Sequence, residues 1–186
     1  MIVFKEWVSQ QELLLEKKGD KHSFSCVMAL FNAKDAKYVL DWSNTYVKDK
    51  NLFTAEDGGM GREDEIHVTV LYGLHTNNVK DIGKITDKVK PFDITLGKVS
   101  KFESNDYDVL KIDVKSDYLH TLNAEFKKMD YTSKFDKYVP HCTIAYVKKG
   151  SCDHLLDKNH FEDKKISINS LTFSSAYGRK TKITLN

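Results

Sequence analysis

The sequence has no long apolar run and no recognisable export segment. None of its apolar stretches approaches the ~18 residues expected of a membrane-spanning helix. The first ten residues, MIVFKEWVSQ, lack the basic segment followed by an apolar one that marks a secretory signal. We therefore expect a cytoplasmic protein that does not associate with a membrane.

Cysteine is scarce, which argues against a disulfide-built scaffold. Cys26, Cys142 and Cys152 are odd in number and have no framework spacing, so we expect reduced thiols. Cys142, Cys152, His154 and His160 lie close together and could suggest zinc. However, the chain has no Cys-x-x-Cys pair, and we predict no metal.

An excess of charge of one sign is also absent. The 29 basic and 27 acidic side chains leave a formal net charge of +2. Long duplex nucleic acid is held by neutralising many phosphates, so a chain with this balance is a poor candidate for that partner. A small anionic ligand remains compatible.

The chain is long enough for one folding unit with a substantial core. Its 186 residues are 40% hydrophobic, as expected of a globular protein. Apolar periodicity predicts strands and helices in both halves. The predicted strands are 24–31, 66–72, 92–102, 107–114 and 141–147, with two more in the tail turning near Gly178; the predicted helices are 32–50, 76–89 and 116–129.

One glycine-rich, acidic stretch interrupts this pattern. Residues 54–65 read TAEDGGMGREDE, a composition typical of an exposed, mobile connection. A lid over a ligand is the alternative, and loops of this length serve either purpose. The sequence leaves both open.

Two short stretches share the pattern His-x-Thr followed by apolar residues. They are IHVTVLYGLH at 66–75 and PHCTIAYV at 140–147. Side chains alternate along a strand, so His67, Thr69 and Leu71 are predicted on one face, with Val68, Val70 and Tyr72 on the other. The second stretch follows the same rule: His141, Thr143 and Ala145 share a face, and Cys142 points into the core.

Two histidines and two hydroxyls are the groups that phosphodiester cleavage needs. The reaction requires a base for the attacking oxygen, an acid for the leaving oxygen and donors to the non-bridging oxygens. Histidine suits both proton roles because its ordinary pKa is about 6.5. We therefore predict that His67, Thr69, His141 and Thr143 form one catalytic site.

The motifs HVTV and HCTI, both set in strands, resemble those of the 2H phosphoesterase superfamily. With the strand FSCVMALF before a helix, they look most like the phage anti-CBASS phosphodiesterases, which degrade cyclic nucleotide signals of bacterial defence. This resemblance implies an α+β fold of two pseudo-symmetric lobes, each a mainly antiparallel sheet with outer helices, around a central cleft. It covers about residues 23–186 and leaves 1–22 as an N-terminal extension.

The resemblance also implies an activity. It indicates a metal-independent phosphodiesterase, with no cofactor, that hydrolyses 3′-5′ bonds of cyclic di- or oligonucleotides, in the host cytoplasm if the source is viral. RNA end processing, on 2′,3′-cyclic phosphates or 2′-5′ linkages, and sequestration without cleavage are the alternatives. The sequence does not decide which histidine is the acid, or whether water or a ribose 2′-hydroxyl attacks.

Nucleobases bind to flat partners, and four aromatic residues end or adjoin the predicted strands. Base stacking is worth roughly 1–3 kcal/mol per base, so these residues are candidate ligand contacts. Packing in the core or at its rim is the alternative for each of them. They are Phe31, Tyr72, Tyr146 and Tyr177.

Overall fold

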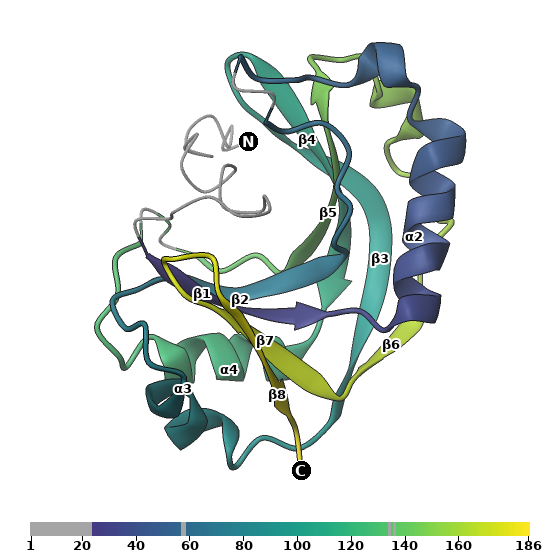
Figure 1. Cartoon of the computed structure of the whole chain (residues 1–186). Helices are drawn as coiled ribbons and strands as arrows, with labels where there is room; N and C mark the ends of the chain where they lie inside the picture. Colours follow the sequence, from purple (N-terminus) through teal and green to yellow (C-terminus); the bar gives the residue numbers. More distant parts are fainter. Residues whose placement is uncertain (1–23, 57–58, 134, 136) are drawn as a thin grey trace.

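The computed structural model describes residues 24–56, 59–133, 135 and 137–186. Its strands form two four-stranded antiparallel sheets (Figure 1). Sheet A has the order β2-β1-β7-β8, and sheet B has the order β5-β4-β3-β6. The predicted extension, residues 1–22, lies outside the described residues.

Sheet A is built around the predicted strand near residue 24. This strand, β1 (Ser25–Leu30), is central and pairs with β2 (His67–Leu74) on one side and with β7 (Ser170–Ser174) on the other. The hairpin partner of β7 is β8 (Lys180–Thr184), and the chain turns at Gly178, which has a positive φ of 77°. Glycine adopts such a φ without strain, as the sequence predicts for this turn.

Sheet B contains the predicted central hairpin. Its long strands β3 (Phe92–Glu103) and β4 (Tyr107–Lys115) pair with each other. The strand of the second motif, β5 (His141–Lys148), pairs with β4. At the far edge, β6 (Lys165–Ile168) pairs with the first residues of β3.

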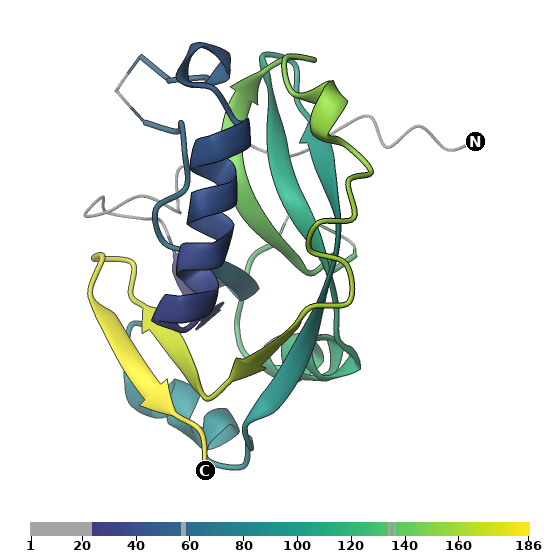
Figure 2. The ribbon, with the colours of Figure 1, turned by 90° about the vertical axis from the view of Figure 1, so that its right-hand side faces the viewer.

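The prediction of two strands in the tail was wrong, because there are three. The stretch KISINSLTFS is interrupted at Asn169, so β6 belongs to sheet B and β7 to sheet A. This crossing from one sheet to the other can be followed in Figure 2. Alternation within the stretch looks continuous, so only the tertiary pairing reveals the break.

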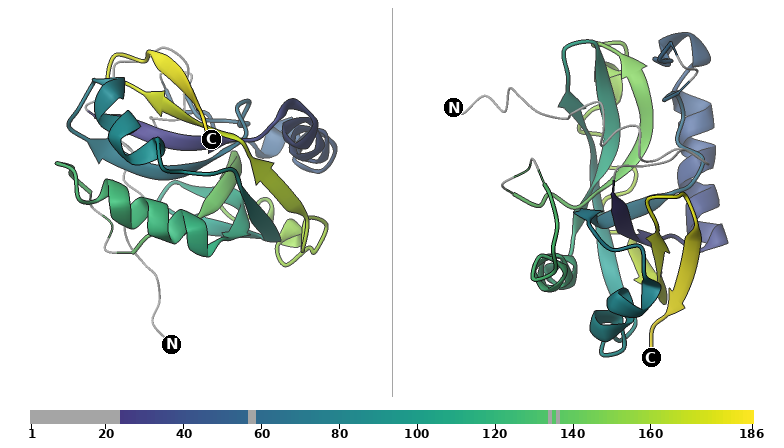
Figure 3. Two further views of the ribbon diagram at one scale, coloured as in Figure 1. Left: turned by 90° about the horizontal axis from the view of Figure 1, so that it is seen from below. Right: turned by 60° about the vertical axis from the view of Figure 1, so that its left-hand side comes forward.

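The helices cover the outer faces of the two sheets. Helix α2 (Ala33–Tyr46) packs against β5, and α4 (Asp117–Phe126) packs against β2. The shorter α3 (Val79–Thr86) lies at the same end of the molecule as α4 (Figures 1 and 3). Asn32 caps α2 as predicted, since its side-chain oxygen accepts from the Asp35 amide at 3.0 Å.

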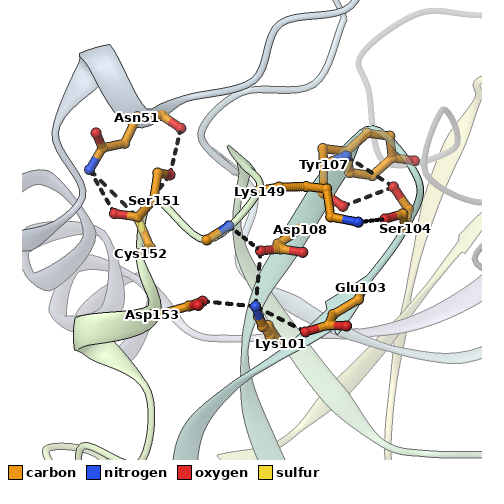
Figure 4. Close-up of polar contacts among 11 residues, drawn as sticks. Asn51, Lys101, Glu103, Ser104, Tyr107, Asp108, Lys149, Ser151, Cys152 and Asp153 are labelled. Atoms are coloured by element: carbon orange, nitrogen blue, oxygen red, sulfur yellow. Dashed lines mark hydrogen bonds and ion pairs between the residues drawn. The ribbon is translucent and has the colours of Figure 1, made fainter. Parts of the chain in front are cut away.

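A partly buried ion-pair cluster lies on the outer face of sheet B (Figure 4). The Lys101 ammonium lies 2.8 Å from Asp153 and 3.1 Å from both Glu103 and Asp108. Asp108 also accepts from the Gly150 amide at 2.8 Å. These bonds join the β3–β4 hairpin to the turn that follows β5.

The predicted α+β fold of two mainly antiparallel lobes with outer helices is therefore confirmed. One continuous apolar core contains residues of both sheets and of α2, α3 and α4. Within the described part of the chain, no helix is long and apolar enough to span a membrane.

Candidate active site

The two His-x-Thr motifs lie on neighbouring sheet edges. Strands β2 and β5 are the outermost strands of sheets A and B, and they contact each other. His67 is the first residue of β2, and His141 is the first residue of β5. The fold therefore brings together two strands that are 141 − 67 = 74 residues apart in sequence.

Each motif strand contains a bulge immediately after its threonine. In β2, Thr69 is opposite Met28 and Leu71 is opposite Val27, so Val70 is an extra residue without a partner on β1. In β5, the residues opposite Lys111 and Leu110 are Thr143 and Ala145, so Ile144 is the extra one. Such a bulge reverses the alternation of side chains beyond it.

The bulges correct the predicted faces of the first motif. His67, Thr69 and Tyr72 lie opposite Leu30, Met28 and Cys26, which alternate along β1 and so share one face. Leu71, predicted beside His67, is instead buried in the core.

The second motif is corrected in the same way. Tyr146 shares a face with His141 and Thr143, whereas Ala145 joins the core. Cys142 is fully buried in that core, as predicted. The two stretches therefore carry the same longer pattern, His-x-Thr-x-x-Tyr, and we call the faces that bear these residues the motif faces of the two sheets.

Both histidine rings are oriented by the same contact. Nδ1 of His67 lies 2.6 Å from the carbonyl oxygen of Glu65, and Nδ1 of His141 lies 2.7 Å from that of Val139. A carbonyl can only accept, so each Nδ1 must carry the proton. In the neutral ring Nε2 is then the basic nitrogen, the one that can take up or release a proton.

The threonine side chains differ in exposure. Thr69 is partly exposed, whereas Thr143 is buried. Both hydroxyls stand two residues after a histidine on a motif face, where a hydroxyl can donate to an anion.

Three groups donate hydrogen bonds to backbone carbonyls at the outer edges of the motif strands. The Tyr138 hydroxyl donates to the Thr69 carbonyl at 2.8 Å, and the Asn123 side chain donates to the Val70 carbonyl at 2.7 Å. In the second strand, the Glu63 amide donates to the Ile144 carbonyl at 2.9 Å. Burial raises the pKa of Tyr138, so its hydroxyl stays protonated and able to donate.

The predicted loop 54–65 is not wholly an exposed connection. Thr54 pairs with Met60, and Arg62 pairs with Ala145 of β5. Met60, Gly61 and Glu63 are buried. The segment thus adds backbone hydrogen bonds to the outer edge of β5, which composition alone could not reveal.

Arg62, in this segment, binds the C-terminal end of α2. Its guanidinium donates to the carbonyls of Ser43 and Val47 at 2.7 and 2.8 Å, and it also pairs with Asp49. These are carbonyls at the C-terminal end of the helix, which lack partners within the helix and favour a nearby cation.

The four candidate base-stacking residues lie in different surroundings. Phe31 belongs to the core, and Tyr146 is only 2% exposed, among Met60, Tyr107 and Val109. Phe31 and Tyr146 are therefore packed in the interior. A base could stack on either ring only if neighbouring side chains moved away from it. Tyr72 is partly exposed on its motif face, and Tyr177 is 72% exposed. Stacking by any of the four stays a prediction.

The sequence interpretation missed a polar group beside the second motif. Lys111 and Asp113 on β4 lie opposite Thr143 and His141, and Ser100 on β3 lies opposite Lys111. Burial raises the pKa of Asp113, but hydrogen bonds from Lys111 and Ser100 and the charges of Lys111 and His141 lower it overall. Strand alternation in YDVLKIDV places this lysine and aspartate on one face, which was the available signal.

The residues considered for zinc do not gather into a metal site. Cys142 and Cys152 are both buried, and His154 is exposed. His160 stacks on Tyr38 with the ring centres 5.3 Å apart. Among the described residues, no group of three or more histidine, cysteine or acidic side chains could hold a metal ion.

Comparison with solved structures identifies the fold. A protein of Thermus thermophilus, TT0787, superposes with a TM-score of 0.63 at 10% identity, covering 87% of this chain and 97% of its own. E. coli LigT in its apo form gives 0.58 at 13% identity, covering 88% and 94%. Kluyveromyces marxianus Usb1 gives 0.55 at 10% identity, covering 92% and 100%. LigT has also been solved with phosphate and with 3′-AMP.

Sequence comparison identifies the family. No curated protein sequence matches this chain significantly. The model of the family described as "Anti-CBASS protein Acb1" matches residues 30–174, a span that contains both motifs. This agrees with the predicted resemblance to 2H phosphoesterases and to their anti-CBASS members. The chain therefore belongs to the anti-CBASS protein Acb1 family.

Proposed function

We propose that this protein is a metal-independent phosphodiesterase that hydrolyses the 3′-5′ bonds of cyclic di- or oligonucleotide signals and so counteracts CBASS defence. The observation that carries the proposal is the matching geometry of the two histidines, each fixed through Nδ1 to the carbonyl two residues before it. Membership of the Acb1 family supports the substrate class.

In this mechanism the two histidines share the proton transfers. One of the two, His67 or His141, has an unprotonated Nε2 and takes the proton of the attacking oxygen. The other, protonated at Nε2, gives its proton to the leaving oxygen. Thr69 and Thr143 donate to the non-bridging oxygens, where negative charge grows in the transition state. The two proton-transfer groups act in opposite protonation states, so kcat/KM has a bell-shaped pH profile.

The direct test is turnover of cyclic GMP-AMP in EDTA. We expect the His67→Ala and His141→Ala variants each to lose about 10²- to 10⁴-fold in kcat. His154→Ala, which alters an exposed histidine outside the motifs, is the control and should retain activity. Wild-type turnover in both motif variants would refute the assigned mechanism, and loss of wild-type turnover in EDTA would refute metal independence.

Two other outcomes would change the function that we assign to the protein. A strong preference for RNA 2′,3′-cyclic phosphate ends in a competition assay would place the chain among RNA end-processing enzymes. Tight binding of cyclic GMP-AMP followed by recovery of the intact ligand would indicate sequestration in place of cleavage.

Tyr72 is the base contact that we consider first, because it shares the motif face of sheet A with His67 and Thr69. Replacing Tyr72 with leucine removes the flat ring but keeps an apolar side chain. Loss of one stacked base then raises KM by about tenfold, while kcat changes little.

A further inference from the structure

The motif face of sheet B carries a buried lysine beside the second motif. Lys111 lies on β4 directly opposite Thr143, and cross-strand neighbours of this kind have Cβ atoms about 4.5–5.5 Å apart. Its side chain is only 5% exposed. This residue therefore stands beside a threonine of the proposed phosphate site.

Two polar groups seat the ammonium of Lys111. It donates to the Ser100 hydroxyl at 2.6 Å and to Asp113 Oδ1 at 2.5 Å. Ser100 in turn donates to the same Asp113 oxygen at 2.6 Å. These three bonds form a closed network that leaves the ammonium little freedom.

The same ammonium also lies over an aromatic ring. Lys111 Nζ is 4.4 Å from the ring centre of Phe102 on β3, a cation–π contact. Phe102 meets the His141 ring edge to face, with the ring centres 4.9 Å apart and an interplanar angle of 88°. A continuous set of contacts thus leads from Lys111 through Phe102 to the imidazole of His141.

Stability alone does not explain this arrangement. A buried ion pair often gives no more stability than well-packed apolar side chains of similar volume, because both charges lose their hydration. Lys101 on the outer face of the same hairpin has a comparable role in joining elements, yet it lies away from the motif. The Lys111 network lies instead on the motif face, where Phe102 contacts both the Lys111 ammonium and the His141 ring.

We propose that Lys111 and Phe102 are positioning residues for His141, with Ser100 and Asp113 as the seat of the lysine ammonium. This inference rests on the proposed function. The Val139 carbonyl fixes the imidazole at Nδ1, and Phe102 fixes the plane of the ring. Together they aim Nε2 at the reacting phosphate.

The charge of Lys111 has a second consequence that a test can use. Among the described residues, the titratable groups on the strands next to His141 are Asp113 and Lys111 on β4, and His67 lies on the contacting strand β2. Removing the lysine charge leaves the Asp113 carboxylate without its ion-pair partner next to the imidazole. An unpaired carboxylate at this position favours the protonated ring.

The test compares the pH profile of cyclic GMP-AMP turnover in wild type and Lys111→Met. We expect kcat to fall by about tenfold or more with KM within about threefold, because orientation of His141 is lost and binding is not. One limb of the profile should move to higher pH by about one unit, and Asp113→Asn in the same chain should move it back. Phe102→Leu should lower kcat without moving the limb of the pH profile. Lys111→Arg keeps the positive charge and should retain most of the activity that Lys111→Met loses.

Lys101→Met is the matched control. It removes a partly buried, ion-paired lysine of the same β3–β4 hairpin, on the face opposite Lys111. It should lower thermal stability and leave kcat and the pH profile unchanged. The inference is overturned if Lys111→Met keeps wild-type kcat, if only KM changes, or if Lys101→Met gives the same kinetic loss. An inactive wild-type protein, or full activity in His141→Ala, would instead overturn the proposed function.

Discussion

Replacing Tyr138 with phenylalanine tests whether the two motifs are coupled through the hydrogen bond between Tyr138 and Thr69. Tyr138 lies two residues before Pro140, which precedes His141. Its hydroxyl donates to the Thr69 carbonyl at 2.8 Å. The substitution removes one oxygen atom and keeps the ring. It therefore deletes a link between the segment that leads into the second motif and the strand of the first.

The expected cost follows from the partial burial of this contact. A buried carbonyl that loses its donor costs about 1–3 kcal/mol in the free energy of unfolding, and a partly buried one lies at the lower end of that range. In a domain of this size 1 kcal/mol corresponds to about 2–4 °C in Tm. We therefore expect Tyr138→Phe to lower Tm by at least ~2 °C, with an unchanged denaturant m-value. Turnover should fall several-fold at temperatures where the variant is fully folded, because the motif strands lose a fixed contact.

Tyr131→Phe is the control, since Tyr131 lies in the same connection and is also partly buried, and its ring contacts Lys127. Denaturant unfolding and turnover of cyclic GMP-AMP are measured for both variants. Equal stability and equal turnover in the two would refute the proposed coupling.

The remaining predictions concern the frame around the site. Gly73→Ala should destabilise the fold by several kcal/mol in denaturant unfolding. Gly73 has φ +102°, and a Cβ there would lie 1.9 Å from the Thr132 carbonyl oxygen. An unchanged unfolding midpoint would contradict this. Asn123→Leu should cost about 1–3 kcal/mol by leaving the Val70 carbonyl without its donor, whereas Asn123→Asp, at a pH where the acid is protonated, should recover part of the loss. The folded-state pKa of Asp113 is lowered, so its stabilising contribution is present above the unfolded pKa of about 3.9 and disappears as the pH falls through the lower folded value. Asp113→Asn should accordingly weaken the pH dependence of unfolding in that acidic range, and an identical dependence would show that the ion pair contributes nothing.

The sequence by itself determined most of the element order and the core positions of the motifs. Alternation in β2 and β5 is local, so it correctly placed Cys142 in the core and Val68 on the face opposite His67. The Asn32 cap and the turn at Gly178 were also readable, because caps and turns depend on residues adjacent in sequence.

Only the tertiary structure decided which residues surround the motifs. The bulges at Val70 and Ile144 arise from pairing with β1 and β4, and they turned Tyr72 and Tyr146 toward the motif faces against simple alternation. Lys111 reaches the second motif through its register with β5, opposite a threonine that is 143 − 111 = 32 residues away in sequence, and no local pattern encodes this contact. The physical reason is that periodicity fixes the face of a side chain within one strand, whereas strand register and bulges depend on the partner strand.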